Sequence, residues 1–298
     1  MTSAELRHCP GCLLTAGASV GQVHGFEIRA CAECGTLFTA RLPEAQESKD
    51  YGSFYADGRD VVIPEFVLDR LQETVSSLAP YRTSLNRWLD IGCGTGTMLR
   101  AVANAGWHEL GTEVAPAAAE AVRAAGLEVL VGETQDLDLP PAGFDIVSMV
   151  EVIEHVPAPD DLLADAARLL RPGGALYLTT PHGRGLSARM LRARWSVVTP
   201  PDHLQLYSSR GVRAALARAG LNVRSVATHG LNPYELLDQL RSARGRQVAR
   251  SNTETSYQLN ESLSTRRTGL MFKRGANAAL SAAGLGDTLK IVAERPLR

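Results

Sequence analysis

Residues 89–96, Leu-Asp-Ile-Gly-Cys-Gly-Thr-Gly, are the segment of this 298-residue chain that says most about its architecture. The apolar residues before Gly92 predict a buried strand, and the closely spaced glycines predict a tight loop that leads into a helix. Glycines let a ligand approach the backbone closely, and a helix N-terminus offers N–H groups without intrahelical partners. Glu113 stands at the end of the next expected strand, where a carboxylate can accept hydrogen bonds from ribose hydroxyls.

Two details of this loop distinguish between adenosine-bearing ligands. Its glycine spacing is GxGxG and not the GxGxxG of nicotinamide-binding folds. Asp90 stands at the mouth of the loop, where a negative charge repels a pyrophosphate and attracts a ligand with an ammonium and a sulfonium group. We therefore expect S-adenosylmethionine and not a dinucleotide.

Around the loop, segments with strand character alternate with segments of helical period. This alternation predicts a parallel sheet covered by helices on both faces. The expected strands are 87–91, 109–114, 127–131, 144–150, 175–180, 221–228 and 288–293, and the expected helices are 64–80, 97–105, 116–125, 160–170 and 209–219. The segment before the last strand is too long for a hairpin loop, so it predicts a helical insertion at 231–285.

Four of the five cysteines stand in two close pairs. Cys9-Pro-Gly-Cys12 and Cys31-Ala-Glu-Cys34 give C-x2-C twice, separated by 18 residues, which is the spacing of four-thiolate zinc sites. Four thiolates leave no open coordination position, so we expect a structural Zn²⁺. Paired thiols favour metal over disulfides in a reducing compartment, and the N-terminus has no secretory signal, so we expect a cytoplasmic protein.

The segments together resemble the class I S-adenosylmethionine-dependent methyltransferases. LDIGCGTG at 89–96, GTEVAP at 111–116, GETQDL at 132–137, FDIVSMVEVIEHV at 144–156 and LLRPGGALYLTTPH at 169–182 are similar to successive motifs of that family. The resemblance covers residues 60–293 and implies an α/β, Rossmann-like seven-stranded sheet whose last strand is antiparallel. It also implies cofactor contacts from Asp90, Gly92, Gly94, Gly96, Glu113, Glu133, Thr134, Gln135, Asp136 and Glu151.

The residues that follow the expected fourth strand indicate an acceptor site. Glu151, Glu154 and His155 share one face if a helical turn forms there, at the carboxyl end of the sheet where ligands bind. The segment EVIEH at 151–155 resembles the ubiquinone-pathway O-methyltransferases. It also resembles the small-RNA 3′-terminal 2′-O-methyltransferases, in which two Glu and two His hold a divalent ion.

Three interpretations of these residues stay open. In the first, Glu151, Glu154, His155 and His203 hold Mg²⁺ or another divalent ion, which binds two neighbouring hydroxyls and lowers the pKa of one. In the second, His203 is a general base oriented by Asp202, without a metal. In the third, Glu154 and His155 only build the start of a helix.

The acceptor class is expected from family resemblance and from charge. A net charge of −1 gives no general attraction for nucleic acid, and residues 1–40 contain only Arg7 and Arg29 as basic residues. We expect O-methylation of a hydroxyl on a small molecule, a sugar or specialised metabolite. Two alternatives stay open: C-methylation of a nucleotide-linked deoxysugar, because Asp-His-x3-Tyr-Ser at 202–208 is similar to enzymes of that class, and an RNA methyltransferase whose zinc ribbon grips RNA.

The domain organisation follows from these segments. We expect a zinc ribbon at 1–40, a linker and N-terminal helix at 41–80, and the S-adenosylmethionine-binding domain at 81–298. No apolar run reaches the roughly 18 residues that span a bilayer, so no membrane partner is expected. We expect a monomer or a homodimer.

Overall fold

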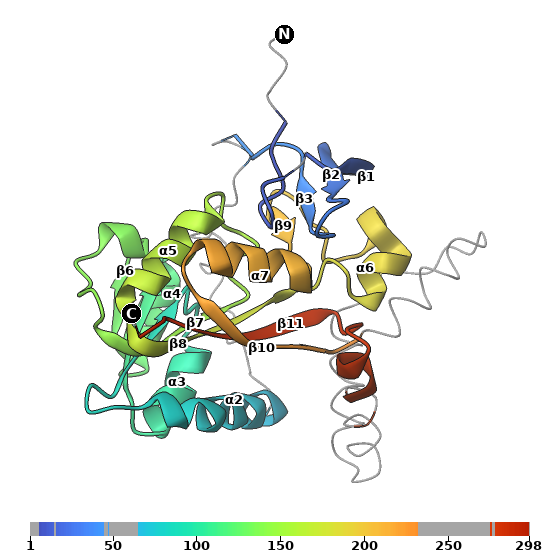
Figure 1. The fold of residues 1–298 in the computed structure, drawn as a ribbon. Coiled ribbons are helices and arrows are strands. Elements are labelled where there is room, and N and C mark those ends of the chain that lie inside the picture. The colour runs from blue at the N-terminus through green and yellow to red at the C-terminus, as the bar shows by residue number, and fades with distance from the viewer. Residues whose placement is uncertain are drawn as a thin grey trace.

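The computed structural model describes residues 6–14, 16–44, 47, 65–231, 275 and 278–297. These residues form a seven-stranded sheet with helices on both faces and a smaller four-stranded sheet (Figure 1). The order of the large sheet is β10-β11-β8-β7-β4-β5-β6. Strands β4 to β8 pair in parallel, whereas β11 pairs antiparallel with both β8 and β10. The predicted methyltransferase-like sheet with an antiparallel last strand is confirmed.

Most elements begin and end within two residues of those expected from the sequence, but β8 begins at Leu170, five residues before the expected start. The strands of the large sheet are β4 (Arg87–Ile91), β5 (His108–Glu113), β6 (Val129–Val131), β7 (Phe144–Val150), β8 (Leu170–Pro181), β10 (Asn222–His229) and β11 (Thr288–Glu294). The helices are α2 (Glu65–Leu78), α3 (Thr97–Asn104), α4 (Pro116–Ala124), α5 (Pro159–Leu169), α6 (Leu186–Leu191) and α7 (Ser209–Arg218), with 3-10 turns η2 (Ala79–Tyr81), η3 (Thr134–Asp136) and η4 (Arg192–Arg194). Of these, α6 was not expected from the sequence.

Side chains of the central strands alternate between two apolar cores. In β4, Trp88 packs with residues of α2 and α3, and Leu89 packs with residues of α5 and α7. Ile146 and Val147 of β7 divide between the same two cores. Successive strand residues point to opposite faces, so a strand covered on both faces is apolar throughout. This is why the central strands were recognisable as continuous apolar runs.

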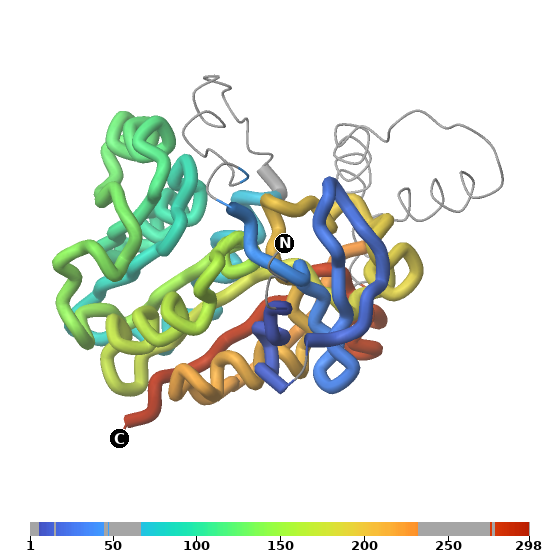
Figure 2. The backbone as a smooth tube through the Cα atoms, turned by 90° about the horizontal axis from the view of Figure 1, so that it is seen from above, coloured from blue at the N-terminus to red at the C-terminus, as the bar shows by residue number. Residues whose placement is uncertain are grey.

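The four-stranded sheet has the order β1-β2-β3-β9, with β1 (Ala18–Val23), β2 (Phe26–Ala30) and β3 (Leu37–Thr39). Its fourth strand, β9 (Gln205–Leu206), is distant in sequence and was not expected; it pairs antiparallel with β3. A third apolar core joins this sheet to the segment around α6 and contains Ile28, Leu37, Leu191, Trp195 and Leu206. Figures 1 and 2 show the N-terminal strands at one side of the large sheet, next to α6 and β9.

Two expectations lie wholly or partly outside the described residues. One is the predicted insertion at 231–285, most of which lies outside the described ranges, although residues 278–282 are helical before β11. The other is the first half of the predicted linker and N-terminal helix at 41–80, of which residues 45–46 and 48–64 lie outside the described ranges. None of the helices in the described ranges is both long enough and apolar enough to cross a bilayer.

Candidate active site and metal centre

The glycine loop joins β4 to α3 at the carboxyl end of the parallel strands. Gly92, Gly94 and Gly96 have φ of 65°, 54° and 79°, in the left-handed region that glycine adopts without strain. A Cβ at Gly92 would lie 2.8 Å from a methyl carbon of Val152, so the loop also packs closely on the residues after β7. Gly96 is the N-cap of α3, and no side-chain oxygen caps the first N–H groups of that helix.

Glu113 ends β5 beside this loop. Its Oε2 accepts the N–H of Gly94 at 2.9 Å, and its Oε1 accepts the N–H of Ala115 at 2.9 Å. The residue is 6% exposed, so the carboxylate is held in one orientation. Because each carboxylate oxygen has two lone pairs, the group can still accept hydrogen bonds from a ribose.

Asp90 lies beneath the loop and is not open to solvent. It is 3% exposed, and its Oδ1 accepts a hydrogen bond of 2.5 Å from Ser148 Oγ, which itself accepts from Trp88 Nε1 at 2.8 Å. Burial raises the pKa of Asp90 to about 7, the bond from Ser148 opposes that rise, and the charge of Glu113 adds to it. A cation bound above the loop would favour the ionised form of this carboxyl group.

The predicted adenine-side residues follow β6. Residues 134–136 form η3, in which Thr134 is buried. The side chains of Glu133, Gln135 and Asp136 are exposed, and Gln135 Nε2 donates to Glu133 Oε2 at 2.7 Å. The N–H of Gly132 donates to the carbonyl of Glu113 at 3.0 Å. The ends of β4, β5 and β6 therefore bring the predicted cofactor residues to one edge of the sheet.

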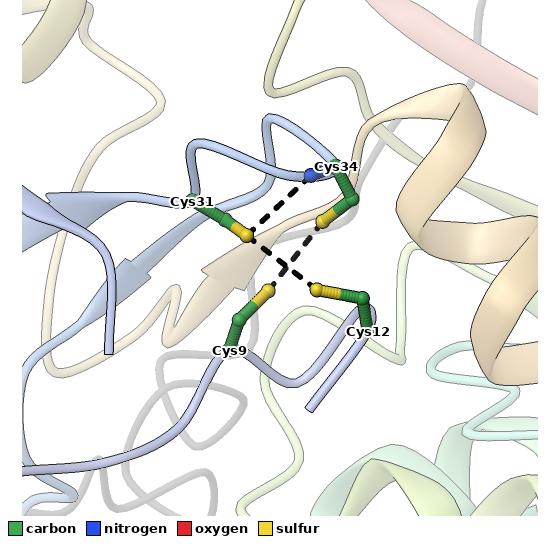
Figure 3. A group of neighbouring side chains, drawn as sticks. All are labelled: Cys9, Cys12, Cys31 and Cys34. Carbon is green, nitrogen blue, oxygen red and sulfur yellow. Dashed lines mark hydrogen bonds between the residues drawn. The ribbon is translucent and has the colours of Figure 1, made fainter. Parts of the chain in front are cut away.

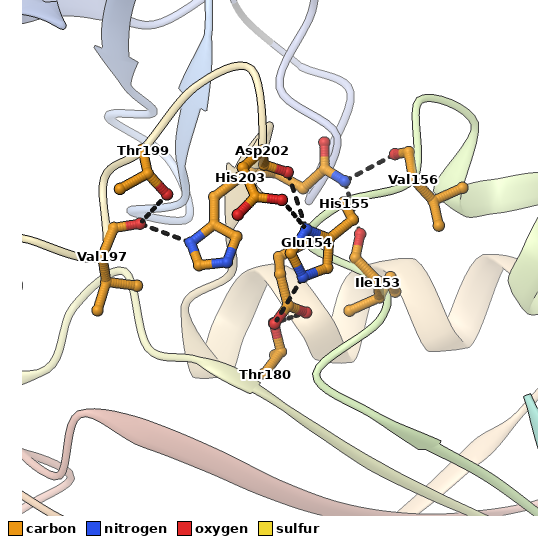
Figure 4. Close-up of polar contacts among 10 residues, drawn as sticks. Ile153, Glu154, His155, Val156, Thr180, Val197, Thr199, Asp202 and His203 are labelled. Atoms are coloured by element: carbon orange, nitrogen blue, oxygen red, sulfur yellow. Dashed lines mark hydrogen bonds and ion pairs between the residues drawn. The ribbon is translucent and has the colours of Figure 1, made fainter. Parts of the chain in front are cut away.

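Glu154, His155 and His203 come together from two segments that are far apart in the sequence. Each offers one ligating atom, and these atoms all lie within 4.8 Å of one another. The His155 and His203 rings contact edge to face with centroids 4.6 Å apart, and His155 Nε2 lies 4.0 Å from Glu154 Oε1. Figure 4 shows the three side chains pointing toward one another. We call them the acceptor cluster.

Backbone carbonyls fix the proton on each imidazole. His203 Nδ1 lies 2.6 Å from the carbonyl of Val197, and His155 Nδ1 lies 2.9 Å from the carbonyl of Asp202. A carbonyl only accepts hydrogen bonds, so each Nδ1 carries the hydrogen and each neutral ring has its lone pair on Nε2. The carboxylate of Asp202 lies 3.1 Å from His155 Nδ1. Asp202 was expected to orient His203, but it orients His155. The carbonyl of Val197 orients His203.

Glu154 is fully buried at the centre of the acceptor cluster. Its Oε2 accepts from Thr180 Oγ1 at 2.9 Å, whereas its Oε1 has no hydrogen-bond partner in the part of the chain that the structure describes. Burial and the nearby charge of Glu151 raise the pKa of Glu154 well above its ordinary value. Leaving a buried carboxylate oxygen unpaired costs free energy, and a cation beside it would remove that cost. One carboxylate and two imidazoles are a suitable donor set for a divalent metal.

No helix directly follows β7, so the condition for a shared helix face at 151–155 is not met; instead, a single turn forms in which the N–H of His155 donates to the carbonyl of Val152 at 3.0 Å. Glu151 has a φ of 55°. The carbonyls of Ile153, Glu154 and Val156 accept hydrogen bonds from residues 204–205 and not from a following helical turn. Glu151 lies outside the group of ligating atoms within 4.8 Å. Three of the four predicted metal ligands therefore meet, but across two segments and not on one helix face.

The four cysteines form a second group (Figure 3). Sγ of Cys9 lies 3.5 Å from that of Cys34, and Sγ of Cys12 lies 3.5 Å from that of Cys31. Tetrahedral zinc with Zn–S bonds of about 2.3 Å requires sulfurs about 3.8 Å apart, so the group fits this ion. The backbone N–H of Cys34 points to Cys31 Sγ at 3.5 Å, as in a metal-binding turn.

Two partners of the acceptor cluster were not identified from the sequence. Thr180 reaches Glu154 because β8 lies beside β7 in the sheet, and its position at the end of β8 was the only signal for it. The carbonyl of Val197 orients His203, and a backbone carbonyl leaves no signal in the residue type.

Comparison with known proteins identifies relatives of this chain. Residues 64–226 match the family model described as a methyltransferase domain. The ubiquinone biosynthesis O-methyltransferase of Xylella fastidiosa strain M23 is 30% identical over 204 residues, which are 63% of this chain and 82% of that protein. The protein of the same name from Maricaulis maris strain MCS10 is 32% identical over 167 residues, 51% of this chain and 65% of that protein.

Solved structures show the same fold. A chain from the complex of the Haloferax volcanii Trm112 methyltransferase activator with a methyltransferase has a TM-score of 0.52 at 22% identity, covering 83% of this chain and 98% of that one. A methyltransferase from Archaeoglobus fulgidus has a TM-score of 0.51 at 16% identity, covering 82% of this chain and all of that one. Since the family model spans more than half of the chain and the glycine loop with Glu113 lies within it, the chain belongs to the class I S-adenosylmethionine-dependent methyltransferases.

Proposed function

We propose that the enzyme transfers the methyl group of S-adenosylmethionine to a hydroxyl oxygen of a small molecule bound beside the acceptor cluster. The observation that carries this proposal is the convergence of one buried carboxylate and two imidazoles, from the segment after β7 and from the segment before β9. The glycine loop follows β4, which is the neighbour of β7 in the sheet, so donor and acceptor would meet at adjacent strand ends. The relatives named as O-methyltransferases support transfer to oxygen.

The chemistry needs alignment and the removal of one proton. A lone pair of the hydroxyl oxygen forms the new O–C bond while the C–S bond breaks. The electron pair of the C–S bond stays on sulfur. The hydroxyl proton must leave, and Nε2 of His203 is a suitable acceptor because Nδ1–H already donates to the carbonyl of Val197. That carbonyl would also stabilise the imidazolium that forms.

In an alternative arrangement, Glu154, His155 and His203 would hold a divalent ion such as Mn²⁺ or Mg²⁺, and the Nε2 lone pair of His203 would then be used for the ion and not for the proton. The Glu154 Oε1 atom without a hydrogen-bond partner in the described residues favours this arrangement over a base alone. Such an ion, when bound, lowers the pKa of a coordinated hydroxyl. His203 then acts as a ligand, and Asp202 keeps His155 oriented toward the ion.

We further propose the binding residues of the cofactor and of zinc. S-adenosylmethionine is held by Asp90, Gly92, Gly94, Gly96, Glu113, Glu133, Thr134, Gln135, Asp136 and Glu151. The four cysteines hold a structural zinc ion within residues 1–40, followed by the segment 41–80 and the catalytic domain 81–298.

A small acceptor is favoured over RNA by the basic residues of the N-terminal sheet. Arg7 donates to the carbonyl of Leu204 and to the side chain of Gln205. Arg29 pairs with Glu27 and donates to the carbonyl of Gly17. Glu27 neutralises Arg29, and both guanidinium groups already donate to acceptors of the protein, so they leave few donors for a phosphate backbone.

Methyl-labelled S-adenosylmethionine tests the proposal. The enzyme is incubated with 3,4-dihydroxybenzoate, with a thymidine-diphosphate-linked deoxysugar and with transfer RNA, and the labelled product is identified by mass spectrometry. We expect a methyl ether of a small molecule, formed by the wild type and by His108→Asn, an exposed histidine on β5, but not by His203→Asn. Label on carbon or in RNA, or turnover that is unaffected by His203→Asn, would overturn the proposal.

A further inference from the structure

Gln205 has a fully hydrogen-bonded side chain at the boundary between the two sheets. It is 1% exposed. Its Nε2 donates to the carbonyls of Ile153 and Val156 at 2.6 and 2.8 Å, and its Oε1 accepts from Arg7 Nη2 at 2.6 Å. One amide group therefore joins the N-terminal segment to both sides of the turn that carries Glu154 and His155.

The backbone next to Gln205 binds the same turn. The N–H of Leu204 donates to the carbonyl of Glu154 at 2.8 Å, and the N–H of Gln205 contacts the same carbonyl at 3.3 Å. His203, the third member of the acceptor cluster, immediately precedes this pair. The turn at 151–156 is neither helix nor strand, and its carbonyls at Ile153, Glu154 and Val156 are paired by these bonds. Residues 203–205 thus fix both halves of the acceptor cluster.

This segment is in turn held by the cysteine module, which we define as residues 6–44. Gln205 and Leu206 form β9, which pairs with Phe38 and Leu37 of β3. The N–H of Thr39 donates to the carbonyl of Leu204 at 3.0 Å. Arg7 lies two residues before Cys9, and β3 begins three residues after Cys34. Arg7 and β3, which both contact residues 204–206, therefore lie within three residues of Cys9 and Cys34 respectively.

We propose that Gln205 is a positioning residue through which the cysteine module shapes the acceptor cluster. The module then sets the geometry of the acceptor side, while the glycine loop and Glu113 bind the cofactor through contacts of their own. This inference rests on the proposed acceptor site. It assigns to the cysteine module a role in catalysis that a purely stabilising module would not have.

Gln205→Met tests this role because methionine keeps the length of the side chain but removes all three hydrogen bonds. The matched control is Arg218→Met. Arg218 also anchors the cysteine module, through the carbonyls of Gly11 and Pro10 at 2.6 and 2.8 Å, but from α7. Both variants should lower the melting temperature, so stability alone does not distinguish them.

The ring signals of His155 and His203, assigned by NMR with His→Asn variants, provide the specific measurement. We expect Gln205→Met to shift both sets of signals and Arg218→Met to leave them unchanged. Gln205→Met should also lower kcat by about 10- to 100-fold, as small misplacements of catalytic groups do, with affinity for S-adenosylmethionine and the content of one zinc per chain unchanged. Unchanged histidine signals in a folded Gln205→Met protein would overturn the inference.

A second pair of variants covers the case in which Gln205→Met does not fold. Arg7→Met should shift the same histidine signals, and Arg7→Lys should restore them, because lysine can still donate to Gln205 Oε1. Equal signals in Arg7→Met and the wild type would contradict the coupling. The histidine signals are read without any acceptor, so a failure to find the methylated small molecule would contradict the proposed function and leave this test intact.

Discussion

Glu113 Oε2 accepts the backbone N–H of Gly94 at 2.9 Å, so the carboxylate at the end of β5 and the glycine loop after β4 form one hydrogen-bonded unit. The second oxygen binds the N–H of Ala115, at the start of α4. These two bonds hold the carboxylate in one orientation without any ligand, as the proposed contact with ribose hydroxyls would need.

Glu113→Ala should therefore weaken the binding of S-adenosylmethionine by about 10- to 100-fold, the range expected when hydrogen bonds to a charged group are lost. Calorimetric titration measures this affinity. The matched control is Glu120→Ala, an exposed glutamate on α4. Equal affinities for Glu113→Ala and the wild type would refute the assignment of the ribose to Glu113.

Asp90 should make stability depend on pH. Its pKa is raised from 3.8 to about 7 in the folded protein, so between these values the folded chain keeps a proton that the unfolded chain has lost. The free energy of unfolding therefore falls as the pH rises through this window, by at most about 1.4 kcal/mol per pH unit. Asp90→Asn should remove this dependence.

Urea denaturation between pH 5 and pH 8 measures the difference between the wild type and Asp90→Asn. The difference in the free energy of unfolding between the two proteins should change between pH 5 and about pH 7 and stay constant above pH 7. Asp138→Asn, at an exposed aspartate, controls for the general effect of removing a carboxylate. If Asp90→Asn and Asp138→Asn follow the same pH curve, the buried carboxyl group does not titrate as described.

The cysteine group should bind one zinc ion per chain. Cys31→Ser should lower the zinc content measured by atomic emission, because it removes one of four ligands from a closed tetrahedral site. Cys93→Ser is the control, since Cys93 lies in the glycine loop and outside the group. Zinc content that is unaffected by Cys31→Ser would show that the thiols do not hold the metal.

Chelation should reveal whether the acceptor cluster uses an ion. We expect EDTA-treated enzyme to lose turnover and to regain it with Mn²⁺ or Mg²⁺, because Glu154 presents a buried oxygen toward His155 Nε2 at 4.0 Å. Zinc analysis of the same sample checks that the cysteine site has kept its metal. Full turnover without added ion would instead leave His203 as the general base.

Much of the fold could be predicted because its signals are local. The strand β4, the glycine loop and α3 are adjacent in sequence, and the apolar run of β7 reflects burial on both faces. The thiol spacing likewise predicted which cysteines meet. In each case the residues that define the feature lie within a short segment or repeat a fixed spacing.

The acceptor side could be predicted only in part because its geometry depends on distant partners. A helical turn at 151–155 is reasonable from spacing, but Leu204 and Gln205 bind the carbonyls of that turn. The strand β9 has two residues, too few for a periodic signal, and exists because β3 pairs with it. The orienting partner of His203 is a backbone carbonyl, which any residue supplies.

A crystal structure with bound S-adenosylhomocysteine would test whether the donor and acceptor sites meet as described. The account predicts ribose hydroxyls on Glu113 and the sulfur atom directed across the end of β7 toward His155 and His203. A nucleoside bound away from the glycine loop, or a sulfur atom directed away from these histidines, would contradict it.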